Sequence, residues 1–302
     1  MSSYRTFTED DFLLQEEKMG YQRGKKPSTF AWNARRLFLS ELEFLTRFWN
    51  PQIPNPQVVY LGHSVDHLKY LSDLLPQLKF HIYTANSSVK ISPSSSLIFH
   101  NEDFSDEVAS SWKRVRSSNT SVYFISNLLT FTSEESAREE VNISDLRDQE
   151  RWFSLMNPNS AFLRFRLPYP DVSKVSEFEY LDGFVFKQPW SLPDSAETRL
   201  VPFGANRKIW STSDYDERMV FHNVEIRQKY RYFNLLDGTE NPVSPQLNNL
   251  FDPTCEVAIF RDYLNKVSGP DVVNKENILY LSNLLSSTLN QGVAPEKQRT
   301  LP

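Results

Sequence analysis

The stretch VVYLGHSVDHLKYL, residues 58–71, contains the sequence pattern of a strand, a turn and a helix, from which the fold class can be predicted. Its apolar residues 58–61 predict a short buried strand that ends at Gly62, and leucines at helical spacing then predict a helix over 67–75. Strands that alternate with helices predict an α/β fold, with a mainly parallel central sheet and helices on both faces. The alternation continues along the chain, with strands predicted at 80–83, 97–99, 121–126 and 161–166 and helices at 35–49, 108–116 and 132–157.

The carboxyl ends of these strands are the expected ligand-binding positions, because an open parallel sheet binds its ligand there. They comprise residues 62–66, 84–86, 126–129 and 167–171. Farther along, apolar residues predict strands near 184–186 and 199–201 and a C-terminal helix over 278–289. We find no internal repeat or linker, so one domain over 1–302 is expected, with a polar lead-in at 1–28 and a flexible tail at 292–302.

Composition narrows the class of protein. With 302 residues, of which 39% are apolar, the chain is long enough for a full hydrophobic core. It has 8 glycines, few for a nucleotide hydrolase with glycine-rich phosphate loops. Cys255 is the single cysteine, which excludes an intrachain disulfide or a cysteine-based zinc site, and we expect no metal centre. The sequence has neither a run of about 18 apolar residues nor a signal peptide, so a cytoplasmic protein is expected.

The formal net charge of −5 bears on nucleic-acid binding. Nucleic-acid binders are usually basic, so a surface that contacts RNA has to be a local patch. Each basic cluster has the alternative interpretation of a solvated face that binds nothing. The clusters are Arg23/Lys25/Lys26, Arg35/Arg36, Lys113/Arg114/Arg116, Arg164/Arg166 and Arg227/Lys229/Arg231.

Five segments in series resemble the poxvirus cap-specific mRNA 2′-O-methyltransferases, which also serve as the small regulatory subunit of the viral poly(A) polymerase. The resemblance covers nearly the whole chain and implies a Rossmann-like fold of the S-adenosylmethionine-dependent methyltransferases. It also implies a heterodimer with the poly(A) polymerase catalytic subunit, capped mRNA as ligand, and a location in the host cytoplasm and virion. The segments are LSELEFLTRF (39–48), VVYLGHSVDHLKYL (58–71), NPNSAFLRFRLPYPD (157–171), SAETRL (195–200) and DYDERMVFHN (214–223).

The catalytic positions depart from the family pattern. The family uses a Lys-Asp-Lys-Glu tetrad to prepare the ribose 2′-OH, and the matching residues here are Arg36, Asn127, Arg164 and Glu197. Arginine stays protonated in proteins and cannot act as a base, and an asparagine cannot supply the carboxylate that tunes a lysine. The alternative interpretation is structural, with Arg164 and Arg166 as ion-paired surface residues on a strand and Glu197 as their partner. Both interpretations predict a poor methyltransferase.

The positions that match the family's cofactor site are Tyr60, Gly62, Asp66 and Thr84. The family's Gly-x-Ala-Pro-Gly turn is here GHSVD (62–66), one residue shorter, and it keeps only the first glycine. A side chain then occupies space that S-adenosylmethionine needs. Thr84 replaces the carboxylate that the family places after its second strand, and a hydroxyl makes a weaker, uncharged contact. We therefore expect weakened binding of S-adenosylmethionine.

The cap-binding positions are better preserved. A methylated guanine is positively charged and is held by aromatic faces with carboxylates at its edge. Tyr169 and Asp171 match an aromatic residue and an acid of the family pocket, and Asp216 stands where the family has a glutamate. Asp194 replaces the second stacking aromatic, for which Tyr21 or Trp32 could substitute. The alternative is that Tyr169 is a turn residue and Asp171 caps a helix.

Three hypotheses follow for the function. The first is a regulatory subunit that holds RNA for a catalytic polymerase partner, because sequence-tolerant RNA binding needs only basic and aromatic side chains. The second is an active cap 2′-O-methyltransferase with an altered tetrad. The third is a scaffold that has kept the fold and neither RNA activity.

Overall fold

A computed structural model describes residues 4–15, 17–19, 33–84, 94–192, 194–233, 235 and 249–289. Its contacts divide the chain into two compact units. The sheet unit comprises Phe48–Phe186 and Glu197–Asp216, and the helical unit comprises Met1–Arg47, Lys187–Ala196 and Glu217–Pro302. The predicted single domain stays a prediction, and the predicted tail at 292–302 lies outside the described residues.

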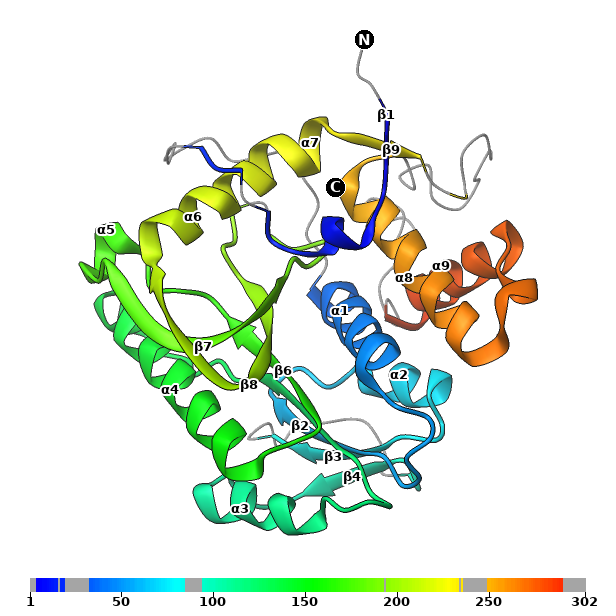
Figure 1. The fold of residues 1–302 in the computed structure, drawn as a ribbon, viewed down its shortest axis with the longest axis horizontal. Helices are drawn as coiled ribbons and strands as arrows, with labels where there is room; N and C mark the ends of the chain where they lie inside the picture. The colour runs from blue at the N-terminus through cyan, green and yellow to red at the C-terminus, as the bar shows by residue number, and fades with distance from the viewer. Residues whose placement is uncertain are drawn as a thin grey trace. The chain divides into compact units, whose positions relative to one another are not determined.

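Seven strands form the central sheet of the sheet unit (Figure 1). The first five strands in spatial order are parallel, whereas β8 runs antiparallel to both β6 and β7. This arrangement confirms the predicted α/β fold with a mainly parallel sheet. In spatial order the strands are β4 (Leu97–His100), β3 (Lys79–Tyr83), β2 (Gln57–Gly62), β5 (Val122–Asn127), β6 (Ser160–Phe165), β8 (Thr198–Ser211) and β7 (Glu177–Phe186).

Helices lie on both faces of this sheet, as predicted. On one face α3 (Asp106–Val115) packs against α4 (Arg138–Met156), and α2 (Leu68–Leu74) lies on the opposite face (Figure 1). Asp106 joins α3 to α4, because it accepts hydrogen bonds from Arg151 (2.8 Å) and Trp152 (3.0 Å). The central strands β2 and β5 are buried along nearly their whole length, as expected where helices cover both faces.

The antiparallel hairpin of β7 and β8 is longer than the sequence predicts. Apolar residues predict strand only near 184–186 and 199–201, whereas β8 continues to Ser211 and β7 begins at Glu177. Most of the second half of β8 is exposed and polar or charged, so it lacks the alternation of a half-buried strand. This part of β8 is a strand because it pairs with β7, which the local sequence pattern does not reveal. The register of the pairing shifts between Leu181 and Gly183. The short helix α5 (Pro170–Ser173) precedes β7, and α6 (Thr212–Phe221) follows β8.

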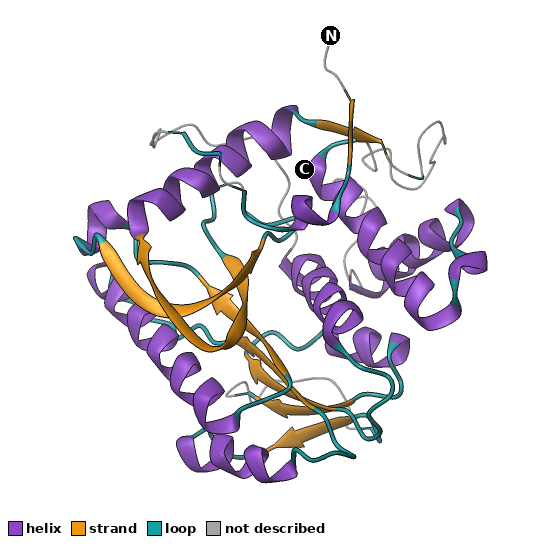
Figure 2. Cartoon of the chain, viewed as in Figure 1, coloured by secondary structure: helices purple, strands orange, loops and turns teal. Residues whose placement is uncertain are grey.

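The helical unit is built mainly from α1 (Asn33–Phe48), α8 (Phe251–Ser268) and α9 (Lys275–Leu289) (Figure 2). The sequence pattern does not predict α8, because it is buried on almost every side and includes two buried acids, Asp252 and Glu256. Its charges are compensated by residues far along the chain: Arg35 Nε donates to Glu256 (2.7 Å) and Arg227 Nη2 donates to Asp252 (2.9 Å).

Short elements complete the helical unit. A two-stranded parallel sheet pairs the N-terminal strand β1 with β9. The elements are β1 (Tyr4–Thr6), the 3₁₀ helix η1 (Glu9–Phe12), the π-helix η3 (His222–Ile226), α7 (Arg227–Lys229), β9 (Arg231–Phe233) and the 3₁₀ helix η4 (Pro270–Val272).

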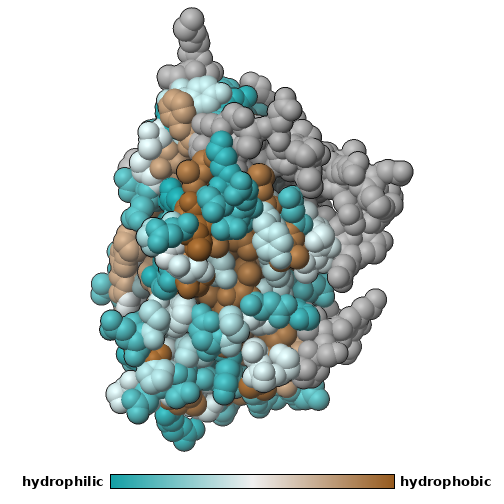
Figure 3. Space-filling view, turned by 90° about the vertical axis from the view of Figure 1, so that its right-hand side faces the viewer, coloured by the Kyte–Doolittle hydropathy of each residue, from teal (hydrophilic) through white to brown (hydrophobic). Residues whose placement is uncertain are grey.

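Within the described residues, no helix combines the length and the apolar character needed to cross a membrane. On the face shown in Figure 3, hydrophilic side chains lie between patches of hydrophobic ones.

Candidate functional site

A row of residues crosses the sheet at the carboxyl ends of its parallel strands. Gly62 on β2 pairs with Asn127 on β5, and Arg164 on β6 pairs with Arg199 on β8. The preceding pairs, Leu61 with Tyr83 and Ser126 with Leu163, place Thr84 beside Gly62 and Arg164 beside Asn127. Four positions that the sequence singles out, at 62, 84, 127 and 164, therefore lie at one edge of the sheet.

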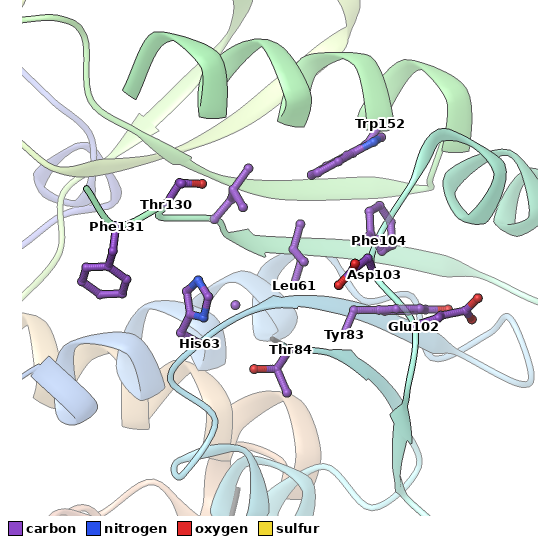
Figure 4. A pocket seen from close by; sticks show the side chains of 12 residues that line it. Leu61, His63, Tyr83, Thr84, Glu102, Asp103, Phe104, Thr130, Phe131 and Trp152 are labelled. Atoms are coloured by element: carbon purple, nitrogen blue, oxygen red, sulfur yellow. The ribbon is translucent and has the colours of Figure 1, made fainter. Parts of the chain in front are cut away.

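A cavity of about 430 Å³ opens at this edge (Figure 4). It meets three of the four predicted strand-end segments, namely 62–66, 84–86 and 126–129. Residues 167–171 do not line it. Its lining is Leu61, Gly62, His63, Tyr83, Thr84, Glu102, Asp103, Phe104, Leu128, Thr130, Phe131 and Trp152.

Two carboxylates of the cavity, Glu102 and Asp103, are absent from the sequence prediction. They follow β4 directly, so the rule that ligands bind at strand ends would have found them if applied to this strand as well. The Nδ1 atom of His100 lies 3.7 Å from Glu102, and burial lowers the pKa of this imidazole. The nearby Glu102 carboxylate opposes this shift in pKa, and neither lysine nor arginine is among the twelve residues that line the cavity.

Aromatic side chains form the wall next to these carboxylates. The ring of Phe104 packs edge-on against Tyr83 (4.9 Å between centroids) and Trp152 (5.0 Å). Burial raises the pKa of the Tyr83 hydroxyl, which accepts a hydrogen bond from Trp112. An aromatic wall beside carboxylates suits a nucleoside, with its base on the rings and its hydroxyl or amino groups on the acids. The cavity thus fits the adenosine half of S-adenosylmethionine, although Thr84 offers only a hydroxyl.

The turn after β2 is held by two hydrogen bonds from buried side chains. Tyr60 Oη donates to the carbonyl oxygen of Ser64 (2.7 Å), and Asn127 Nδ2 donates to Tyr60 Oη (2.9 Å). A Cβ at Gly62 would lie 3.0 Å from the Asn127 Cβ, a close contact that would require its neighbours to give by a few tenths of an ångström. Tyr60 shapes the turn, and neither it nor Asp66 lines the cavity. Their roles in cofactor binding stay predictions.

Two of the tetrad positions, Arg164 and Glu197, form an ion-pair cluster with Arg199. Arg164 Nε donates to Glu197 (2.8 Å), and Arg199 Nη2 lies 3.4 Å from the other oxygen of the same carboxylate. Arg164 also donates to Asn142 (3.3 Å). The ion pair of Arg164 with Glu197 is therefore present, but Arg164 is buried and is not the surface residue that the sequence predicts. The sequence analysis did not single out Arg199, the buried second partner of Glu197.

Arg36 belongs to a different unit from these residues. It lies on α1 of the helical unit, where its Nη2 donates to Asn33 (2.6 Å). The catalytic roles of Arg36, Asn127, Arg164 and Glu197 stay predictions.

The expected cap-binding residues come from several parts of the chain, and two of them flank or begin the short helix α5. The Arg166 guanidinium stacks 4.7 Å from the Tyr169 ring centroid and pairs with Glu139 (2.9 Å), whose carboxylate also accepts from the Tyr169 backbone N–H (3.0 Å). The partner of Arg166 is therefore Glu139 and not Glu197. Asp171 lies in the first turn of α5 without capping it, since Tyr169 is the residue before the helix.

The remaining cap-binding candidates belong to other segments of the chain. Asp216 is a buried residue of α6, Asp194 is an exposed residue of the helical unit, and Tyr21 and Trp32 lie outside the described residues. The cap-binding roles of all these side chains stay predictions. Among the described residues, the structure forms no cluster of three or more metal-binding side chains.

Comparison with known proteins identifies the family. The cap-specific mRNA (nucleoside-2′-O-)-methyltransferase of Fowlpox virus (strain NVSL) is 26% identical over 236 residues, which cover 70% of this chain and 76% of that protein. The solved structure of human methyltransferase-like protein 13 in complex with SAH shares 10% identity, covers 61% of this chain and 88% of that chain, and has a TM-score of 0.32. The family model of the poly A polymerase regulatory subunit matches residues 9–290, and the chain therefore belongs to this family, as its sequence predicts.

Proposed function

We propose that the chain is the regulatory subunit of a poxvirus-type poly(A) polymerase, which holds capped mRNA for a catalytic partner and does not itself transfer methyl groups. It would act in the host cytoplasm and in the virion. The observation that supports this proposal is the ion-pair cluster of Arg164, Glu197 and Arg199 at the position where the chemistry would need a base.

Methylation of a ribose 2′-OH requires a group that accepts or orients its proton. Arg164 is permanently protonated, and its Nε already donates to Glu197. The Asn127 amide is a donor to Tyr60 and carries no negative charge. Glu197 is the one carboxylate at these positions, and each of its oxygens faces a guanidinium group. Proton transfer to it would break a buried ion pair, which is costly.

Two measurements test the regulatory role directly: complex formation with the catalytic subunit, and the length of the poly(A) tail that this subunit adds. The chain, coexpressed with the poly(A) polymerase catalytic subunit, is expected to copurify with it and to lengthen the tails that it adds to an RNA primer. The catalytic subunit alone is the control. Absence of a complex, or tails of equal length with and without the chain, would contradict the proposal.

The second candidate function is cap 2′-O-methyl transfer, favoured by the cavity with Glu102, Asp103 and its aromatic wall. These residues would hold the adenosine half of S-adenosylmethionine, which supplies an electrophilic methyl group when bound. The residues that would handle the acceptor hydroxyl are those of the Arg164 cluster, and they are poorly suited to it.

Calorimetric titration with S-adenosylmethionine, followed by a labelling assay on capped RNA, separates the two functions. Cofactor binding without label transfer supports the regulatory function. Label transfer that is abolished by Glu197→Gln would establish the methyltransferase and overturn the first proposal.

A further inference from the structure

An exposed aromatic ring stands at the mouth of the cavity. The Phe131 side chain is 77% exposed, more than any other large apolar side chain in the described ranges. Its ring centroid lies 5.7 Å from that of His63, at an interplanar angle of 54°. Figure 4 shows the two rings at one end of the cavity, with Glu102 and Asp103 toward the other.

The loop that carries Phe131 is tethered to the fold. The preceding residue, Thr130, donates hydrogen bonds from its backbone N–H (2.9 Å) and its Oγ1 (2.7 Å) to the carboxylate of Asp145. Asp145 is buried on α4. The backbone next to Phe131 is therefore anchored to α4, and such pre-organisation lowers the entropic cost of binding.

Charge is distributed unevenly along this edge of the sheet. The acids Glu102 and Asp103 follow β4, whereas Arg164 and Arg199 lie on β6 and β8. Phe131 follows β5, which lies between these strands in the sheet. Phosphate groups are repelled from the acidic end of the cavity, whereas the arginines on β6 and β8 add no negative charge to the other side. A nucleotide chain that crosses this edge would thus keep its phosphates away from the β4 side and bring its bases to the rim.

We infer that Phe131 and His63 form a stacking site for one base of single-stranded RNA. The inference rests on the proposed RNA-holding function and assigns one contact to it. Stacking on an aromatic face is sequence-tolerant, because every base has such a face, and this suits a subunit that holds varied transcripts.

Phe131→Ala tests the site, with RNA affinity measured by fluorescence anisotropy on a short labelled single-stranded oligoribonucleotide. We expect about tenfold weaker binding, which corresponds to about 1.4 kcal/mol. Phe131→Trp is expected to keep the affinity of the wild type, since it keeps a stacking face. The matched control is Val115→Ala, which truncates another exposed apolar side chain, at the C-terminal end of α3.

The salt dependence distinguishes stacking from charge effects. Loss of a stacking contact leaves the slope of log affinity against log salt unchanged, because no phosphate contact is removed. An altered slope, or unchanged affinity in Phe131→Ala, would overturn the inference and leave the RNA-holding function standing. Weaker binding of S-adenosylmethionine with unchanged RNA affinity would also overturn it, since the rim would then serve the ligand of the cavity. A wild-type chain that does not bind RNA would refute the proposed function itself.

Discussion

At the scale of single residues, Gly62 shows how closely the turn after β2 is packed. A Cβ at this position would lie 3.0 Å from the Asn127 Cβ and 3.3 Å from Tyr60 Cε1. Both neighbours are buried and hydrogen-bonded to each other, so they cannot move away freely. We expect Gly62→Ala to lower the free energy of unfolding by about 1–3 kcal/mol, the usual cost of overpacking.

Urea unfolding measures this change. Ser64→Ala in the same turn is the control, because the hydrogen bond from Tyr60 is accepted by the backbone carbonyl of residue 64 and survives the substitution. It is expected to change stability by less than about 0.5 kcal/mol. Equal stabilities of the two variants would mean that the turn relaxes around the added methyl group.

At the scale of elements, the tether between the β5–α4 loop and α4 depends on Asp145. Replacement of Asp145 by alanine removes the two carboxylate oxygens that accept hydrogen bonds from Thr130. Because Thr130 is exposed, its N–H and hydroxyl groups can then bind water instead. We expect Asp145→Ala to cost about 1–2 kcal/mol, less than the loss of a fully buried charged bond. Hydrogen exchange at the Thr130 amide should become faster.

Asp148, one turn farther along α4, supplies the control. It pairs with Arg151 at the surface (2.8 Å), and surface pairs contribute little. Asp148→Ala should therefore leave the Thr130 amide protected and change stability by less than about 1 kcal/mol. Unchanged exchange at Thr130 in Asp145→Ala would show that the loop is held by other contacts.

At the scale of the whole molecule, buried ionisable groups make stability depend on pH. In the helical unit, burial raises the pKa of Glu43 to about 8 and lowers that of Lys187 to about 8. Between pH 4.5 and 8 the folded state binds the Glu43 proton more tightly than the unfolded state, so stability falls as the pH rises. Between pH 8 and 10.5 the unfolded state binds more protons at Lys187, so stability rises with pH.

Variants separate these two effects from those of other groups. His81 in the sheet unit acts in the opposite direction to Glu43, because burial lowers its pKa to about 4 and stability then rises with pH up to about 6.5. Urea unfolding between pH 4.5 and 8 should show that the wild type loses stability relative to Glu43→Gln as the pH rises toward 8. Lys187→Met should lack the rise above pH 8. If the difference in free energy of unfolding between the wild type and Glu43→Gln does not change with pH, the raised pKa of Glu43 is contradicted.

Much of the sheet and part of its site could be predicted from the sequence. Strands β2 to β6 were placed within a residue or two, because buried parallel strands are short apolar runs with a strong local signal. The resemblance also picked out Gly62, Asn127 and Arg164, which the structure brings to one edge of the sheet. The carboxylates after β4 were missed because family matching draws attention only to the positions that the family uses.

The order of strands and helices, the parallel sheet and the edge at which a ligand is expected could be predicted from the sequence, because they follow from local periodicity and from the chirality of βαβ connections. The extent of β8, the existence of α8 and the ion pairs of Arg164 are evident only in the folded chain. Each of these depends on partners distant in the chain: Arg35 and Glu256 are 221 residues apart, and Arg164 and Glu197 are 33 apart. A charge looks solvent-exposed in a sequence until its partner is known, because burial of a charge is tolerable only when it is paired.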